Sequence, residues 1–170
     1  MNAPILIFAI GNESRGDDAI APLLLRKLSD WLETEGCHGQ FELLEEFQLQ
    51  VEHAVDMIGR ELVLFIDACM DISTPYRFYR ARTNDNPTLY SHAITPEAVL
   101  STYKQVYLEN PPPAFVLGIH GKKFELGSSL SPEAAQHMEL AMIFLQELLQ
   151  QTNVVAWESH AQALPAAIPG

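Results

Sequence analysis

Residues 4–11 read Pro-Ile-Leu-Ile-Phe-Ala-Ile-Gly, a short run of apolar side chains that stops at a glycine. An unbroken apolar run of this length is typical of a strand that is buried on both faces of a sheet. Two other stretches have the same character, ELVLFIDA at 61–68 and AFVLGI at 114–119. The three segments predict buried strands of one sheet.

Weaker patterns predict further elements around these strands. Residues 41–47 indicate another strand, and residues 77–82 indicate an edge strand because their alternation of apolar and polar side chains is weak. Apolar residues recur at helical spacing from Asp18 to about Trp31, which predicts a helix. Residues 49–58 predict a short helix.

Two three-residue segments, Thr-Pro-Glu at 95–97 and Ser-Pro-Glu at 131–133, carry a complete signal for the start of a helix. Each has a capping hydroxyl, a proline at the first helical position and an acid in the first turn. They predict helices that end near residues 110 and 151. Because strands alternate with helices, we expect an α/β fold with five strands in a mostly parallel sheet, covered on both sides.

The size and composition of the chain fit one globular domain. Its 170 residues can bury a substantial core but are too few for two domains of ordinary size. Hydrophobic residues make up 48% of the chain and charged residues 19%, which excludes a disordered protein. We expect one domain over residues 1–152. Residues 153–170, rich in alanine and proline, are expected to form a loosely ordered tail.

The charge of the chain limits its partners. A formal net charge of −12 opposes binding to nucleic acid and to anionic membrane surfaces. The chain has two cysteines, Cys37 and Cys69, which do not make a disulfide framework, and its start lacks a basic leader. We therefore expect a cytoplasmic protein with no nucleic-acid or membrane partner.

The ends of the three apolar strands are the first places to look for chemistry, because open α/β sheets bind ligands beyond the carboxyl ends of their strands. The first strand leads into GNESRGDD, residues 11–18, and the second ends at Asp67. His120 follows the third. Counted over all five predicted strands, the strand at 4–10 is the first and the strand at 61–68 is the third. In a sheet of order 2-1-3-4-5 these two strands are neighbours, so Asp18 and Asp67 would face one crevice.

The glycine-bearing loop at 11–18 does not match a phosphate site. It lacks GxGxxG and GxxxxGK[ST], and Asp17 and Asp18 would repel a pyrophosphate. Carboxylates there suit a cation, although they can also simply cap the following helix. Asp67 favours the cation because a carboxylate at the end of a buried strand must be hydrogen-bonded, paired or bound to metal. Acids at strand ends are nevertheless common.

A histidine would complete a site suited to a borderline metal such as zinc or nickel. His92 precedes a predicted helix start, and His120 directly follows a strand. Spacing alone does not choose between them. The other four histidines lie in predicted solvent-facing segments or within helices; they are His38, His53, His137 and His160.

Other catalytic signatures are missing from the sequence. It has no GxSxG, CxxC or HExxH motif. Cys69 lies two residues beyond Asp67, but a small buried hydrophobic role explains it better than a catalytic one.

Taken together, four segments resemble the hydrogenase maturation proteases. They are GNESRGDD, LVLFIDA, SHAITPEAVL with His92, and VLGIHGKKFELGSSLSPEAAQHMELAMIFLQELL. Each motif alone is weak, but their order and spacing are specific. The resemblance runs from Ile5 to about Leu149.

This resemblance implies a three-layer αβα fold with a twisted sheet of flavodoxin-like or phosphorylase-like order. It implies that Asp18, Asp67 and His92 bind a metal and carry catalysis, with Gly11, Asn12 and Asp17 supporting the loop. The metal would be nickel already inserted in the substrate, although zinc or cadmium can take the same position. The implied activity is removal of the C-terminal extension from the nickel-loaded precursor of a NiFe-hydrogenase large subunit by an enzyme that is monomeric when free.

The chain departs from the family pattern in places. Residues 45–48 stand where many relatives have a glycine-rich turn that faces the substrate, which makes Gln48 a candidate for substrate recognition. His120 is unusual for the family and is a second candidate, either as a ligand or as a substrate contact. Two other functions stay open: a metal-sensing chaperone of the large subunit that does not cut, and a small-molecule or nucleotide-binding domain, which the acidic loop disfavours.

Overall fold

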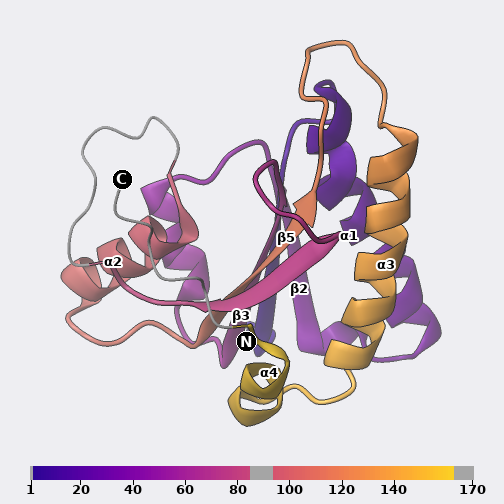
Figure 1. Cartoon of the computed structure of the whole chain (residues 1–170). Coiled ribbons are helices and arrows are strands. Elements are labelled where there is room, and N and C mark those ends of the chain that lie inside the picture. Colours follow the sequence, from indigo (N-terminus) through magenta and orange to yellow (C-terminus); the bar gives the residue numbers. More distant parts are fainter. Residues whose placement is uncertain (1, 85–93, 163–170) are drawn as a thin grey trace.

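The computed structural model describes residues 2–84 and 94–162. A five-stranded sheet separates two layers of helices (Figure 1). Its strands are β1 (Ile5–Ile10), β2 (Phe41–Glu46), β3 (Leu62–Cys69), β4 (Tyr76–Ala81) and β5 (Ala114–His120). The sheet order is β2-β1-β3-β5-β4, in which β4 alone runs antiparallel to its neighbour. The predicted α/β class is confirmed.

The described residues form the α-helices α1 (Ile20–Thr34), α2 (Pro96–Tyr107), α3 (Pro132–Leu148) and α4 (Val154–His160), with 3-10 helices η1 (Gly16–Ala19), η2 (His38–Gln40) and η3 (Val51–Met57). Of the α-helices, α1, α2 and α3 lie close to their predicted positions. The two predicted helix starts are confirmed, because the Thr95 and Ser131 hydroxyls accept hydrogen bonds from the third residue after each of them. The short helix predicted at 49–58 is of the 3-10 type.

The last two strands are exchanged relative to the order 2-1-3-4-5. Parallel neighbours need a crossover of a dozen or more residues, and only residues 70–75 separate β3 from β4. The chain therefore turns back, and β4 runs antiparallel. The position beside β3 is taken by β5, which follows α2. The prediction of an edge strand near 77–82 is confirmed.

The two faces of the sheet carry separate apolar clusters. One is packed by α1, α3 and α4 and contains Phe78 stacked on Phe115, with ring centroids 5.3 Å apart. The other is packed by α2 and η3 and contains Phe8 stacked on Phe65 at 5.2 Å. The side chains of the two clusters come from alternate positions of the same strands. The central strands are thus buried on both sides, as their unbroken apolar runs predict.

The prediction of a loosely ordered tail from residue 153 is wrong for residues 154–160. They form α4, whose Trp157 is fully buried and packs edge-on against Phe78 and Phe115. Asn153 caps the helix by accepting a hydrogen bond from the backbone of Ala156. A seven-residue helix anchored by one aromatic side chain is too short to show helical periodicity. Residues 163–170 lie outside the described part of the chain.

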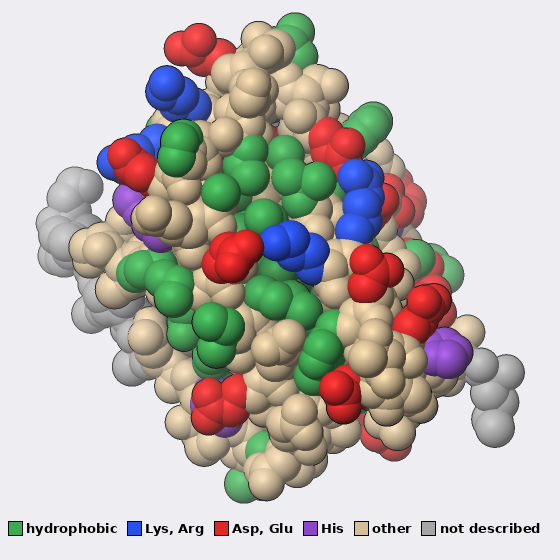
Figure 2. All heavy atoms as spheres, turned by 90° about the vertical axis from the view of Figure 1, so that its right-hand side faces the viewer, with side chains coloured by type: hydrophobic (Ala, Val, Ile, Leu, Met, Phe, Trp, Pro, Cys, Tyr) green, Lys and Arg blue, Asp and Glu red, His purple; other side chains and the backbone are tan. Residues whose placement is uncertain are grey.

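The outer surface of the α1 and α3 layer mixes apolar and charged side chains (Figure 2). On α3, Leu140 is 45% exposed and Ile143 is 63% exposed. Lys27 of α1 and Glu139 of α3 form an ion pair at 3.2 Å. Exposed pairs of this kind contribute about 0–1 kcal/mol, so the buried contacts hold α3 in place. Over residues 2–84 and 94–162 no helix is both long and apolar enough to cross a bilayer.

Candidate functional site

The carboxyl ends of β1 and β3 lie side by side, with Ile10 of β1 in register with Asp67 of β3. The loop after β1 folds back on itself there. The Asp18 carboxylate accepts a hydrogen bond of 2.7 Å from the backbone N–H of Asn12. Gly11 permits this close approach, because a Cβ atom at that position would lie 2.0 Å from the carbonyl oxygen of Asp18. The short loop thus brings Asp18 back to the strand end.

Asp18 and Asp67 are brought together at this edge, where the charge of Asp18 affects the ionisation of Asp67. Burial and, after it, the negative charge of Asp18 raise the pKa of Asp67 to about 7. Burial also raises the pKa of Asp18, although the Asn12 N–H and the positive charge of Arg15 oppose the shift. Two half-buried carboxylates that repel each other are stabilised by a shared proton or a shared cation.

His92, the third member of the predicted metal site, lies outside the described residues. Within residues 2–84 and 94–162, no group of three or more His, Cys, Asp and Glu side chains converges as metal ligands would. The described part of the predicted site therefore consists of its two carboxylates. They are oxygen donors, which accept divalent cations.

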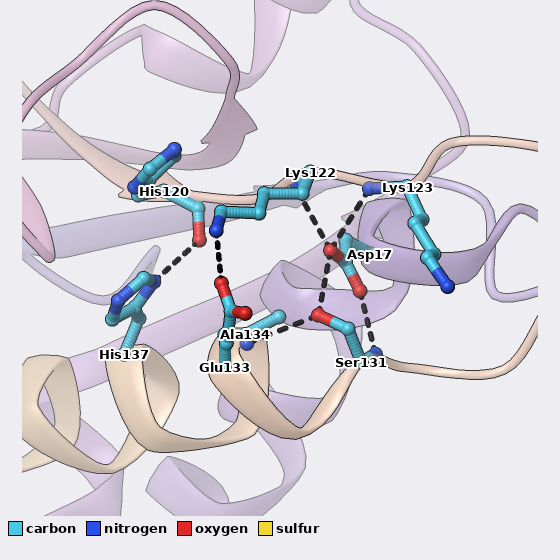
Figure 3. Close-up of polar contacts among 8 residues, drawn as sticks. All are labelled: Asp17, His120, Lys122, Lys123, Ser131, Glu133, Ala134 and His137. Atoms are coloured by element: carbon cyan, nitrogen blue, oxygen red, sulfur yellow. Dashed lines mark hydrogen bonds and ion pairs between the residues drawn. The ribbon is translucent and has the colours of Figure 1, made fainter.

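Asp17 fastens the loop after β1 to the start of α3 (Figure 3). Its carboxylate is fully buried and accepts backbone hydrogen bonds from Lys122, Lys123 and Ser131 at 2.7–3.1 Å. It accepts a fourth from the Ser131 hydroxyl at 2.9 Å. Burial alone would raise the pKa of Asp17, but these four hydrogen bonds hold it below its ordinary value. Asp17 is thus ionised at neutral pH and attaches the loop that carries Asp18 to the start of α3.

Gly16 allows the loop after β1 to approach the backbone of Lys123 closely. Gly16 has a φ of +56°, and a Cβ atom there would lie 2.4 Å from the carbonyl oxygen of Lys123. The backbone N–H of Asp17 donates to that same oxygen at 2.6 Å. The loop at 11–18 and the segment at 121–131 are therefore one packed unit, although about a hundred residues separate them in the chain.

His120, a candidate for substrate recognition or ligation, ends β5 and faces α3 (Figure 3). Its ring stacks on that of His137, with centroids 5.2 Å apart and planes 10° apart. His137 Nδ1 donates to the His120 carbonyl oxygen at 2.9 Å, since that oxygen can only accept. Beside the pair, Lys122 forms an ion pair with Glu133. These contacts orient the His120 ring, and its recognition role stays a prediction.

Gln48, the other recognition candidate, is exposed in the turn after β2 and lies beside a pocket. The pocket has a volume of about 330 Å³ at the ends of β1 and β2. Its lining includes Glu13, Glu45 and Phe47 but not Gln48. Arg26 bridges Glu13 and Glu45, and Phe47 is 77% exposed at the rim. Phe47, an aromatic residue at the end of the strand predicted at 41–47, was the one sequence signal for this pocket.

Sequence reasoning also missed Arg77. It lies on β4 in register with Gly118 of β5, which is itself in register with Asp67 of β3. Side chains in register on adjacent strands point to the same face, so Arg77 and Asp67 share a face at one end of the sheet. The sequence gives no signal for this placement because it depends on the reversed direction of β4.

Comparisons with known proteins agree on the fold. No protein-family model and no curated protein sequence matches the chain. Among solved structures, the NiFe hydrogenase maturation protease HycI of Thermococcus kodakarensis is similar, with a TM-score of 0.64 and 21% identity over 88% of this chain and 94% of that one. The hydrogenase maturating endopeptidase HybD of E. coli gives a TM-score of 0.62 and 22% identity over 86% and 91%.

A third structure, the endopeptidase HycI of Escherichia coli, gives a TM-score of 0.63 and 16% identity over 93% of this chain and 95% of that one. The likeness therefore extends over nearly the whole length of each protein. The chain has the fold of the hydrogenase maturation proteases, the family that its sequence motifs resemble.

Proposed function

We propose that the protein is a hydrogenase maturation endopeptidase, which removes the C-terminal extension from the nickel-loaded precursor of a NiFe-hydrogenase large subunit. The observation that carries the proposal is the convergence of Asp18 and Asp67 at the carboxyl edge of β1 and β3. The fold shared with solved maturation proteases supports it. The order of the sequence motifs, which resembles that family from Ile5 to about Leu149, supports the proposal too.

The two carboxylates suit recognition of a cation that arrives with the substrate. Without the cation, burial and the charge of Asp18 oppose ionisation of Asp67, which keeps its proton below about pH 7. A divalent ion between the two carboxylates removes the repulsion and displaces the proton. Nickel held by the precursor would thus favour docking, whereas a metal-free precursor would leave the carboxylates uncompensated. In the proposed complex His92 adds an imidazole ligand.

The chemistry that follows is hydrolysis of one peptide bond. The oxygen of a water molecule bonds to the carbonyl carbon, its proton passes to a base, and the C–N bond breaks as the leaving amine takes up a proton. The proposed site offers a carboxylate as the base, and the substrate nickel lowers the pKa of a nearby water. Asp17 keeps the loop that carries Asp18 in place through its four hydrogen bonds.

Substitution of the two carboxylates tests the proposal. Asp18→Asn and Asp67→Asn keep the side-chain shape, and asparagine at 18 can still accept the hydrogen bond from Asn12. We expect both variants to fold and to process nickel-loaded precursor at least about 100-fold more slowly than wild type, since each loses a cation ligand and a proton acceptor. Intact mass of the precursor over time gives the rate.

The control is Asp30→Asn, which removes an exposed carboxylate from α1 without touching the site. It should process the precursor at the wild-type rate. Wild-type rates in both site variants would contradict the proposed site. Stable binding of the loaded precursor with no change in its mass, even by wild type, would instead indicate a chaperone that does not cut.

A further inference from the structure

One row of residues crosses the sheet at the carboxyl edge, formed by Asp67 on β3, Gly118 on β5 and Arg77 on β4. Paired positions on adjacent strands direct their side chains to one face. Gly118 contributes no side chain to the row. Two strand spacings, roughly 10 Å, separate the backbones of Asp67 and Arg77. An acid and a cation thus stand on either side of a glycine.

The contacts of Arg77 show that its side chain lies inward over β5. A Cβ atom placed on Gly118 would lie 3.6 Å from Cγ and from Nε of Arg77, and 3.0 Å from the Sγ of Cys69. The guanidinium carbon lies 5.4 Å from the centre of the Tyr79 ring. The arginine stem therefore packs over Gly118, on the face of the sheet that also carries Asp67.

The guanidinium packs over the Tyr79 ring, but its charge has no counterion in the described part of the chain. Nε of Arg77 is buried and makes no hydrogen bond, and within residues 2–84 and 94–162 no carboxylate forms an ion pair with Arg77. By contrast, Arg80 on the opposite face of the same strand pairs with Glu158.

A cation without a counterion, on the same face of the sheet as Asp67, is suited to a negative charge that forms during reaction. We propose that Arg77 is a catalytic residue of the proposed protease site, whose guanidinium donates hydrogen bonds to the carbonyl oxygen of the scissile peptide. This role rests on the proposed function. As water adds to the carbonyl carbon, the electron pair of the C=O bond moves to oxygen, and the guanidinium binds that oxyanion.

The charges then return to their starting state. Water gives its proton to a carboxylate of the site, the C–N bond breaks, and the leaving amine takes the proton. The oxyanion restores its C=O double bond and releases Arg77. Arginine fits this position because it stays charged at every relevant pH and presents several donors in a fixed plane. Its hydrogen-bonding capacity is free in advance, so little reorganisation is needed.

The test compares Arg77→Met, Arg77→Lys and Arg80→Met in the full-length protein, with nickel-loaded precursor as substrate. Methionine keeps the apolar stem and removes all donors, and we expect kcat to fall about 100- to 1000-fold with KM nearly unchanged. Lysine keeps the charge but not the planar fork, and it should recover part of the rate. Arg80→Met removes a cation from the other face of β4 and should cut at the wild-type rate.

Thermal unfolding separates this role from a structural one. Because Arg77→Met removes a buried donor that has no partner, its melting temperature should equal or exceed that of wild type. A lower melting temperature with unchanged kcat in either Arg77 variant would overturn the role of Arg77 and leave the proposed function standing. Failure of wild type to cut the loaded precursor would overturn the proposed function, and the role of Arg77 with it.

Discussion

At the scale of single residues, the ionisation of Asp67 determines how the empty site behaves. Burial and, after it, the charge of Asp18 raise its pKa in the folded protein to about 7. In the unfolded chain the same carboxyl titrates near its ordinary pKa of 3.8. The folded state therefore binds one more proton between these values, and its stability falls as pH rises from about 4 to 7.

Asp67→Asn should remove this penalty, because an amide does not ionise. We expect the variant to be more stable than wild type by about 2–4 kcal/mol at pH 8, with a much smaller gain at pH 4.5, where folded Asp67 is protonated. Urea unfolding of both proteins at the two pH values measures the difference. An equal gain at both would mean that Asp67 ionises normally in the folded protein.

The residues of the candidate site differ in how far sequence could place them. Asp18 and Asp67 were predictable because the carboxyl ends of neighbouring parallel strands share one edge of a sheet. Arg77 was not, since a strand with weak alternation does not reveal that it runs antiparallel beside β5. The register that joins Arg77 to Asp67 through Gly118 is a property of the sheet and becomes visible only with coordinates.

At the scale of elements, the Asp17 hydrogen bonds join the loop after β1 to the start of α3. Asp17→Ala would leave the backbone N–H groups of Lys122, Lys123 and Ser131 without their acceptor. We expect a loss of about 2–4 kcal/mol in the free energy of unfolding. Faster hydrogen exchange at these three amides should accompany it, with Asp30→Ala as the exposed control. Unchanged exchange would show that the loop and α3 are held by other contacts.

The helix α4 gives a second test of element packing. Trp157 is fully buried between Phe78 and Phe115, whereas Val155 on the same helix is 75% exposed. We expect Trp157→Ala to destabilise the protein by about 3–5 kcal/mol and Val155→Ala by well under 1 kcal/mol. Denaturant unfolding measures both. Equal, small effects would indicate that α4 is only loosely attached, as its sequence suggested.

Elements with strong local signals were the predictable ones. The buried runs of β1, β3 and β5 and the capped starts of α2 and α3 carry their structure in a few adjacent residues. The helix α4 does not, because one tryptophan docking into a preformed apolar cluster determines it. The order of the last two strands follows from the length of the connection at 70–75, which becomes informative only after the ends of both strands are known.

At the scale of the whole molecule, the sheet places its polar side chains at one edge. The carboxyl ends of β1 and β3 carry the acid pair, a pocket of about 330 Å³ lies at the ends of β1 and β2, and β5 leads into the segment fixed by Asp17. Exposed apolar side chains follow three of these strands: Phe47, Met70 and Leu126. In the proposed function this edge receives the precursor.

If the acid pair recognises nickel carried by the substrate, cleavage must depend on the nickel content of the precursor. Purified protein is incubated with the large-subunit precursor in its nickel-loaded and metal-free forms, and the intact mass of the precursor is followed. We expect the loaded precursor to lose its C-terminal extension while the metal-free form keeps its full mass. Equal cleavage of both forms would contradict recognition through nickel, and no cleavage of either would contradict the protease itself.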